Sequence, residues 1–185
     1  ELIKQASRTI WGQERRCTGV QRVLIELMQN TNNHASRGDG PEFWWISLQH
    51  LKKENKVIFC FVDFGVGVFE SLSKKSPGDH LYAIWHAILQ TIGITSFGIA
   101  NEADALRLIL TGQVHETVTD KYFRGKGLPG IHKALSDNHI SNMHMITNRA
   151  YYSSRDETFR NMKQSFSGTF ISWEISSTNR SLPKT

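Results

Sequence analysis

The chain is poor in cysteine and proline and has no long apolar run, and each shortage excludes a class of protein. Its 185 residues include only 2 cysteines and 4 prolines. Two cysteines cannot form a disulfide framework, so Cys17 and Cys60 are expected to be reduced thiols of a cytoplasmic protein. No stretch approaches the roughly 18 apolar residues that cross a bilayer, so we expect no membrane span.

Composition and charge are those of a soluble globular protein. Hydrophobic residues make up 39% of the chain and charged residues 21%, which is too apolar for a disordered chain. The formal net charge of +5 favours anions such as nucleotides, although solubility alone also explains it. The basic residues are scattered, without a basic arm or an aromatic-interleaved stripe. Nucleic acid is therefore not an expected partner.

The start of the sequence bears on domain organisation. The first residue is Glu1, not methionine, and no signal-peptide pattern follows it. No internal repeat, low-complexity tract or linker divides the chain, so we expect a single domain over residues 1–185. One interpretation is that this domain is excised from a longer polypeptide with flanking domains.

Residues 15–35 form an amphipathic helical pattern. Apolar side chains recur at i, i+3, i+4 and i+7, which is the rhythm of a buried stripe. Glu26, Asn30 and Asn33 recur at i, i+4 and i+7 and therefore share another face. That face is rotated by roughly a third of a turn from the stripe, so we expect it at the rim of the core, lining a cleft. The stripe contains Val20, Val23, Leu24, Leu27, Met28 and Thr31.

The rest of the chain alternates between strand and helix patterns. Residues 42–50 and 56–62 predict a β-hairpin whose second strand, apolar at nearly every position, is covered on both faces. Helices are predicted at 68–72, 81–92, 102–110 (with Asn101 as a cap) and 128–137. Closing strands are predicted at 142–147, 149–152 and 169–175, with a turn at 163–168, a mobile segment at 111–124 and a frayed tail at 177–185.

These elements in this order predict an α/β fold. The expected architecture is a two-layer α/β sandwich, in which helices cover one face of a sheet. The large aromatic side chains are expected to pack in the core or on the sheet. They include Trp44, Trp45, Trp85 and Trp173.

Asp63 begins the first of two glycine clusters, Asp63-Phe64-Gly65-Val66-Gly67, directly after the apolar strand. Its carboxylate can accept a hydrogen bond from an exocyclic amine such as N6 of adenine. Gly65 and Gly67 allow the backbone to approach a flat base or to adopt a positive φ. A simple strand-to-loop turn explains the same residues, because Asp and Gly are common there.

The second glycine cluster is Arg124-Gly125-Lys126-Gly127-Leu128-Pro129-Gly130. Alternating glycines before a helix expose backbone N–H groups to an anion, and Arg124 and Lys126 add positive charge. The cluster is not a Walker loop, because no Gly-Lys-Ser/Thr ends it. A flexible loop is the alternative explanation.

Glu26 and Asn30 lie one helical turn apart and could divide the work of a phosphate site. The amide oxygen of Asn30 can ligate Mg²⁺, which prefers oxygen ligands. The carboxylate of Glu26 can orient or deprotonate an attacking water or hydroxyl. An ordinary solvated helix face is the alternative.

Taken together, the three segments resemble the nucleotide-binding domain of the GHKL superfamily, which includes DNA gyrase, large heat-shock chaperones, sensor histidine kinases and mismatch-repair ATPases. Residues 26–34 resemble its asparagine box, and the two glycine clusters resemble its first and second glycine boxes. Gly168-Thr169 resembles a late Gly-Thr pair whose threonine supports the adenine-binding aspartate by hydrogen bonding. The similarity extends from about Val20 to Ile175.

The resemblance implies a Bergerat fold, with a mixed, mostly antiparallel sheet, that binds ATP and Mg²⁺. It implies Glu26 as a general base and Asn30 as the magnesium ligand. The residues that it implies for ATP binding are Asn30, Asn33, Asp63, Gly65, Gly67, Arg124, Gly125, Lys126, Gly127, Leu128 and Thr169.

One departure from the family pattern is Pro129, which interrupts the second glycine box and removes an N–H donor. Two functions remain open, and a basic nucleic-acid-binding domain without nucleotide chemistry is a weaker third. The first is weak ATPase or serine/histidine-kinase-like phosphoryl transfer, since Glu26 four residues before Asn30 is the arrangement of family members with a general base. The second is a non-catalytic, ATP-dependent switch. A protein partner, a flanking domain or a second copy of the chain would receive the signal.

Overall fold

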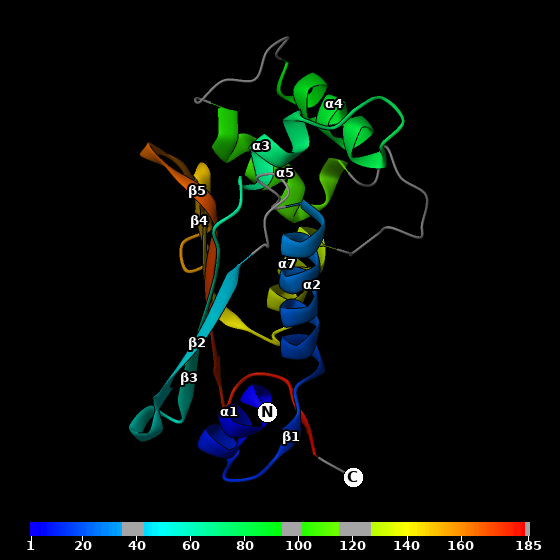
Figure 1. Cartoon of the computed structure of the whole chain (residues 1–185). Coiled ribbons are helices and arrows are strands. Elements are labelled where there is room, and N and C mark those ends of the chain that lie inside the picture. The colour runs from blue at the N-terminus through cyan, green and yellow to red at the C-terminus, as the bar shows by residue number, and fades with distance from the viewer. Residues whose placement is uncertain (35–42, 94–100, 115–126, 184–185) are drawn as a thin grey trace.

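A four-stranded sheet and a layer of helices make up the two layers of the molecule (Figure 1). The computed structural model describes residues 1–34, 43–93, 101–114 and 127–183. The predicted two-layer α/β architecture is confirmed. The predicted mixture of strand directions is wrong, because every strand pairing among the described residues is antiparallel.

The sheet has the strand order β2-β3-β5-β4. The predicted hairpin is confirmed: β2 pairs with β3 from Trp44↔Asp63 to Leu51↔Lys56. A short 3-10 turn, η1 (Lys52–Glu54), and Asn55 at a left-handed φ of 48° connect these two strands. The strands are β2 (Trp44–Leu51), β3 (Lys56–Asp63), β4 (Ser141–Ser153) and β5 (Thr158–Ser176).

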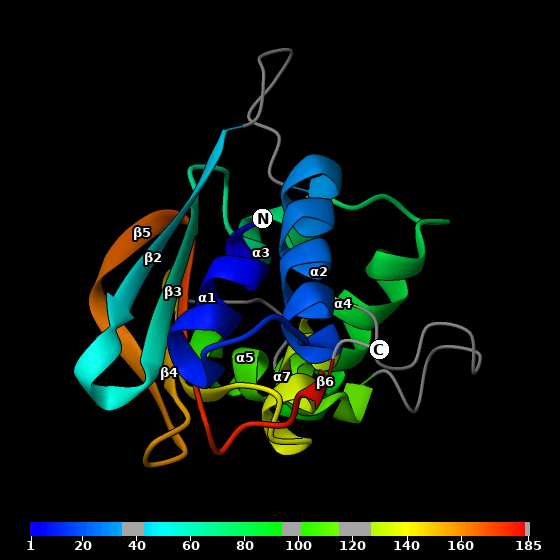
Figure 2. The same ribbon diagram turned by 90° about the horizontal axis from the view of Figure 1, so that it is seen from below.

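The helices lie together on one side of the sheet in Figures 1 and 2. The helices predicted from residues 68, 81, 102 and 128 onward are all present, with boundaries shifted by one residue or less. The sequence made no prediction for residues 1–14, which contain another helix. The helices are α1 (Leu2–Trp11), α2 (Thr18–His34), α3 (Val68–Ser73), α4 (His80–Ile92), α5 (Glu102–Thr111) and α7 (Leu128–Ser136).

The helix predicted for residues 15–35 begins later, at Thr18. Arg15 and Arg16 form strand β1 (Arg15–Arg16), which pairs with strand β6 (Leu182–Pro183) near the C-terminal end of the chain. The backbone N of Arg15 also donates to Oγ of Ser7 (3.1 Å). Nη1 of Arg15 donates to Oγ of Ser181 (3.3 Å), 166 residues away in sequence. The segment is extended because it pairs with the C-terminal part of the chain, and local periodicity cannot reveal such a partner.

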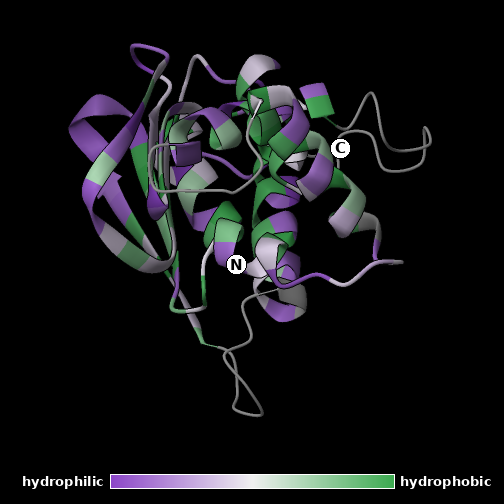
Figure 3. Ribbon diagram, turned by 90° about the horizontal axis from the view of Figure 1, so that it is seen from above, coloured by the Kyte–Doolittle hydropathy of each residue, from purple (hydrophilic) through white to green (hydrophobic). Residues whose placement is uncertain are grey.

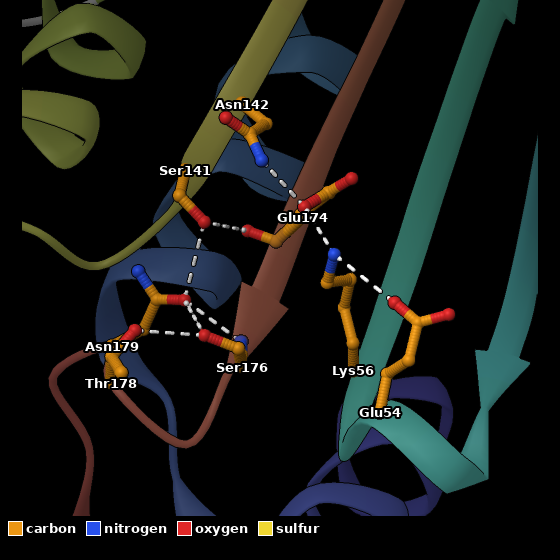
Figure 4. Close-up of polar contacts among 8 residues, drawn as sticks. All are labelled: Glu54, Lys56, Ser141, Asn142, Glu174, Ser176, Thr178 and Asn179. Carbon is orange, nitrogen blue, oxygen red and sulfur yellow. Dashed lines mark hydrogen bonds and ion pairs between the residues drawn. The ribbon is translucent and has the colours of Figure 1, made fainter. Parts of the chain in front are cut away.

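The frayed tail predicted for residues 177–185 is wrong as far as residue 183. Asn179 is 5% exposed, and its Oδ1 accepts the backbone N–H of Ser176 (2.8 Å). Its Nδ2 donates to Oδ1 of Asn138 (3.0 Å), and the N of Arg180 donates to the carbonyl of Asn138 (2.8 Å). Figure 4 shows Asn179 between Ser176 and the hydroxyl of Ser141. These buried hydrogen bonds fix the chain before β6, because an unpaired buried amide would be costly.

The predicted breaks in the last strands are wrong as well. β4 is one strand through residues 142–152, and β5 runs through the predicted turn at 163–168. The two strands pair along their length, with register shifts at Thr147/Asn148 and Asn148/Ala150. Residues 163–168 are mostly polar and locally resemble a turn, but pairing with β4 keeps them extended. Figure 4 shows the far end of the sheet, where Lys56 bridges Glu174 (3.2 Å) and Glu54 (3.4 Å).

The core lies between the sheet and the helices. Alternate residues of β3 are buried, and Phe59 stacks on Trp173 of β5 with ring centroids 5.2 Å apart. In Figure 3 the hydrophobic segments gather where the helices face the sheet. The prediction that both faces of β3 are covered is wrong, because the other alternate residues are only half-buried. Trp45 is likewise 68% exposed, contrary to the expectation of a packed aromatic.

No helix in the described ranges is both long and apolar enough to cross a membrane. The predicted mobile segment, residues 111–124, is described only at its start. Thr111 ends α5, and Val114 is 2% exposed in the core. The rest of that segment lies outside the described residues.

Candidate functional site

Asp63 ends the central strand β3 on its buried side, because the two-residue period of the strand places it in line with Phe59 and Phe61. The carboxylate is 7% exposed. Its Oδ1 accepts hydrogen bonds from the backbone N of Gly65 (3.0 Å) and of Thr169 (3.2 Å). A buried carboxylate needs such donors. The predicted support of Asp63 by Thr169 is therefore present as a backbone hydrogen bond.

The backbone geometry at residue 168 requires a glycine before Thr169. Its φ is +120°, and a Cβ at this position would lie 2.1 Å from the carbonyl oxygen of Asp63. Only glycine permits this approach of the two backbones. The Gly-Thr pair thus allows β5 to deliver the Thr169 amide to the Asp63 carboxylate.

The sequence did not identify Thr147 and Asn148 as site residues. Both side chains bond to the chain just after Asp63: Oγ1 of Thr147 accepts the N–H of Val68 (3.0 Å), and Oδ1 of Asn148 accepts the N–H of Phe69 (3.1 Å). The available signal was the break at Asn148 between two predicted strands. An asparagine that interrupts a strand pattern is a candidate for a left-handed bulge residue, and Asn148 has a φ of +51°.

Glu26 and Asn30 lie next to Gly127 of the second glycine cluster. Oε2 of Glu26 accepts the backbone N–H of Gly127 (2.6 Å), the residue before α7. Oδ1 of Asn30 lies 3.8 Å from the position that a Cβ on Gly127 would occupy. The Glu26 side chain is 13% exposed, and Nε of Arg22 lies 3.9 Å from its Oε1. A carboxylate, an amide oxygen and a glycine N–H therefore converge at the start of α7.

Pro129 is compatible with the start of α7, although it contributes no N–H donor there. Pro129 lies within the first two positions of the helix, where an N–H has no partner inside the helix in any case. The helix has no acidic residue in its first turn and no side-chain cap on Gly127. The carboxylate of Glu26, from another helix, supplies the negative charge that a helix N-terminus favours.

The remaining predicted site residues are placed less fully. Leu128 is 7% exposed and packs in the core, so only its backbone is available to a ligand. Asn33 lies in α2, but its side chain is outside the described part. Arg124, Gly125 and Lys126 lie outside the described residues altogether.

The two groups of residues lie toward the same end of the molecule. In Figure 1, α2 and β3 run in the same direction, so that Asn30 near the end of α2 and Asp63 at the end of β3 face one end. In the sheet, Asp63 pairs with Trp44, the first residue of β2, on one side and with Thr169 of β5 on the other. The arrangement therefore agrees with a single site bounded by Asp63 on the sheet and Asn30 on α2.

The donor set suits a magnesium ion that arrives with a phosphate group. Among the residues that the structure describes, no three His, Cys, Asp or Glu side chains gather closely enough to hold a metal ion. Mg²⁺ is usually bound through one or two protein oxygens, completed by substrate phosphates and waters. One amide oxygen at Asn30, next to the N-terminus of α7, fits that pattern.

Comparison with known proteins found no match to this chain among family models or curated sequences. Its function must therefore be inferred from the residues themselves.

Proposed function

We propose that this chain is a Mg-ATP-binding domain of GHKL type, with the Bergerat fold and weak ATPase or serine/histidine-kinase-like phosphoryl transfer. One observation carries the proposal. The backbone N of Thr169 donates to Oδ1 of Asp63 across 106 residues of sequence. This hydrogen bond joins the two motifs whose partnership the resemblance implies. The two-layer architecture and the contact between Glu26 and Gly127 add support.

Each residue has a distinct role in this proposal. Asp63, fixed by two backbone donors, would accept a hydrogen bond from the exocyclic amine of adenine. Asn30 would contribute an oxygen ligand to Mg²⁺, and the N–H of Leu128, in the first turn of α7, would face a phosphate oxygen. Glu26 would orient or deprotonate the attacking water or hydroxyl. Bound Mg-ATP supplies the transferable phosphoryl group, and the protein contributes mainly positioning and charge neutralisation.

Mg-ATP is expected to stabilise the folded chain. At about 100 times its dissociation constant, a ligand adds roughly 2.7 kcal/mol to the free energy of unfolding. For a domain of this size, that corresponds to an increase in melting temperature of about 5–11 °C. A melting scan with Mg-ATP, Mg-GTP and Mg²⁺ alone measures it. An equal shift with GTP would contradict adenine recognition by Asp63, and no shift with any nucleotide would contradict the proposal.

The variant Asp63→Asn is expected to bind Mg-ATP about 10- to 100-fold more weakly, as judged by calorimetry. Asparagine keeps an oxygen for the N–H groups of Gly65 and Thr169, but it loses a charged hydrogen bond to adenine worth about 1.5–3 kcal/mol. Asp79→Asn is a matched control, because Asp79 also accepts a backbone N–H, that of Leu81 at the start of α4. Equal affinity of the two variants would count against Asp63 as the adenine ligand.

A non-catalytic switch is the second candidate, and an exposed apolar surface favours it. Phe64, directly after Asp63, is 52% exposed, while Phe43 and Trp45 near the start of β2 are 63% and 68% exposed. The N of Phe64 donates to the carbonyl of Phe43 (3.4 Å), so these residues are neighbours. Such patches commonly bind partners. Tight Mg-ATP binding without phosphate release would identify the switch.

A cytoplasmic location remains part of the proposal. Cys17 and Cys60 are both free thiols in the structure, and burial raises the pKa of each. A raised pKa keeps a thiol protonated and unreactive. Neither cysteine therefore has the character of a catalytic or redox residue.

A further inference from the structure

We propose that the β4 bulge, Thr147 and Asn148, is a positioning clamp that sets the geometry of the purine end of the site without touching the nucleotide. This inference rests on the proposed function. The segment to be positioned is residues 64–69, the loop after Asp63 together with the first two residues of α3, here called the purine loop. It contains two glycines, Gly65 and Gly67, which leave the backbone free to adopt many conformations. Something outside the loop must therefore fix it.

Asn148 holds the purine loop from both sides. Its Nδ2 donates to the carbonyl of Val66 (2.9 Å), and its Oδ1 accepts the N–H of Phe69 (3.1 Å). The side chain is 8% exposed. Gly67, with a φ of +82°, packs so closely that a Cβ there would lie 2.5 Å from Oδ1 of Asn148. The Asn148 amide thus fills the space that a side chain at Gly67 would need, and it bonds to the backbone on either side of Gly67.

Thr147 joins the purine loop to the Gly168-Thr169 pair. Its Oγ1 accepts the N–H of Val68 (3.0 Å) and donates to the carbonyl of Gly168 (3.2 Å). It also lies 3.3 Å from Oγ1 of Thr169. Thr147 is fully buried. One hydroxyl therefore links the two segments that meet at the Asp63 carboxylate.

The bulge is itself held from behind by α5. The N–H of Arg149 donates to Oε2 of Glu102, the first residue of that helix. Glu102 is 9% exposed, and burial raises the pKa of its carboxyl, although the hydrogen bond from Arg149 opposes that shift. The N–H of Ala103 next to it donates to Oδ1 of Asn161 on β5. A buried carboxylate here indicates that the bulge is built into the fold rather than being an irregular strand end.

The clamp makes a prediction about which ligands are affected. If the loop forms the purine end of the site, its position affects the affinities for adenosine, ADP and ATP equally, because all three carry the same base. A change at the phosphate end would not give equal losses for the three. A change in general stability would lower all three affinities equally, because it lowers the folded fraction, but urea unfolding would reveal it. Equal losses in a variant that urea unfolding shows to be fully folded under the binding conditions therefore distinguish a positioning role from a merely structural one.

The variant Asn148→Gly is the first test. Glycine accepts the left-handed φ of this residue without strain, so the variant removes the two side-chain hydrogen bonds and the packing of the amide against Gly67 without straining the backbone. We expect the affinities for Mg-ATP, Mg-ADP and adenosine to fall by the same factor, about 5- to 30-fold. Asn55→Gly is the matched control, because Asn55 has a φ of +48° in the β2–β3 turn. It should bind all three ligands like the unaltered chain.

The pair Thr147→Val and Thr147→Ser is the second test and keeps the proposal open to refutation if Asn148→Gly fails to fold. Serine retains the hydroxyl and should preserve the three affinities, whereas valine keeps the shape, loses the hydroxyl and should weaken all three equally. Unchanged affinities in Thr147→Val, or a loss for ATP but not for adenosine, would overturn the clamp. If the unaltered chain binds no purine at all, the proposed function fails and the clamp with it.

Discussion

Replacing Glu26 by glutamine is expected to lower phosphate release about 100- to 10,000-fold, which is the usual contribution of a general base. Mg-ATP affinity should change little. Glutamine can still present an oxygen to the N–H of Gly127, now 2.6 Å from Oε2 of Glu26, but it cannot accept a proton. Phosphate release under saturating Mg-ATP, together with calorimetry, measures the two effects separately.

The alanine variant of the same residue separates chemistry from positioning. Glu26→Ala removes both the base and the contact that holds the start of α7, so it should lose turnover and also bind Mg-ATP more weakly than Glu26→Gln. Glu70→Gln is a suitable control, since Glu70 is an exposed glutamate paired with Lys74 on α3. If turnover persists in both Glu26 variants, Glu26 is not the base.

Replacing Gly168 by alanine is expected to lower the free energy of unfolding by about 2–5 kcal/mol. The positive φ costs about 1–2 kcal/mol for a residue with a Cβ, and the overlap with the Asp63 carbonyl adds about 1–3 kcal/mol. The Cβ would lie 2.1 Å from that oxygen. The other nearest atoms, the carbonyl carbon of Asp63 and the Cα of Phe64, also belong to the backbone and cannot rotate away. Urea unfolding monitored by circular dichroism measures the change.

Gly78 provides the matched control for this experiment. It also has a left-handed φ, +101°, but nothing lies within 4 Å of a Cβ placed there. Gly78→Ala should therefore show only the conformational cost, about 1–2 kcal/mol. Equal destabilisation by the two variants would show that the close approach of Gly168 to Asp63 does not contribute to stability.

Local patterns were sufficient where neighbours in sequence decide the structure. The stripe of α2 is buried as predicted, with Val20, Val23 and Leu27 each 3% exposed or less. The β2–β3 hairpin follows from two apolar runs joined by a short polar connection. Both elements depend on side-chain periodicity and on turns of a few residues, which are encoded locally.

Local patterns failed where distant partners decide the structure. Arg15 and Arg16 are extended because of β6, and β5 is continuous through residues 163–168 because β4 pairs with it. Asn179 is buried because its Nδ2 donates to Oδ1 of Asn138 and its Oδ1 accepts the backbone N–H of Ser176. In each of these places a polar sequence has no local preference strong enough to resist its long-range partner.

The sequence by itself determined which chemical groups could form a site: a carboxylate after an apolar strand, an amide and a carboxylate one helical turn apart, and glycines where the backbone must come close. The resemblance implied that Thr169 supports Asp63. Only the tertiary structure decided that the backbone N–H of Thr169 makes this bond, that Glu26 meets Gly127, and that Thr147 and Asn148 stand behind the purine loop. The physical reason is that residue type and spacing specify what a side chain can bond. Which groups become partners depends on strand pairing and close packing between segments about 80 to 106 residues apart.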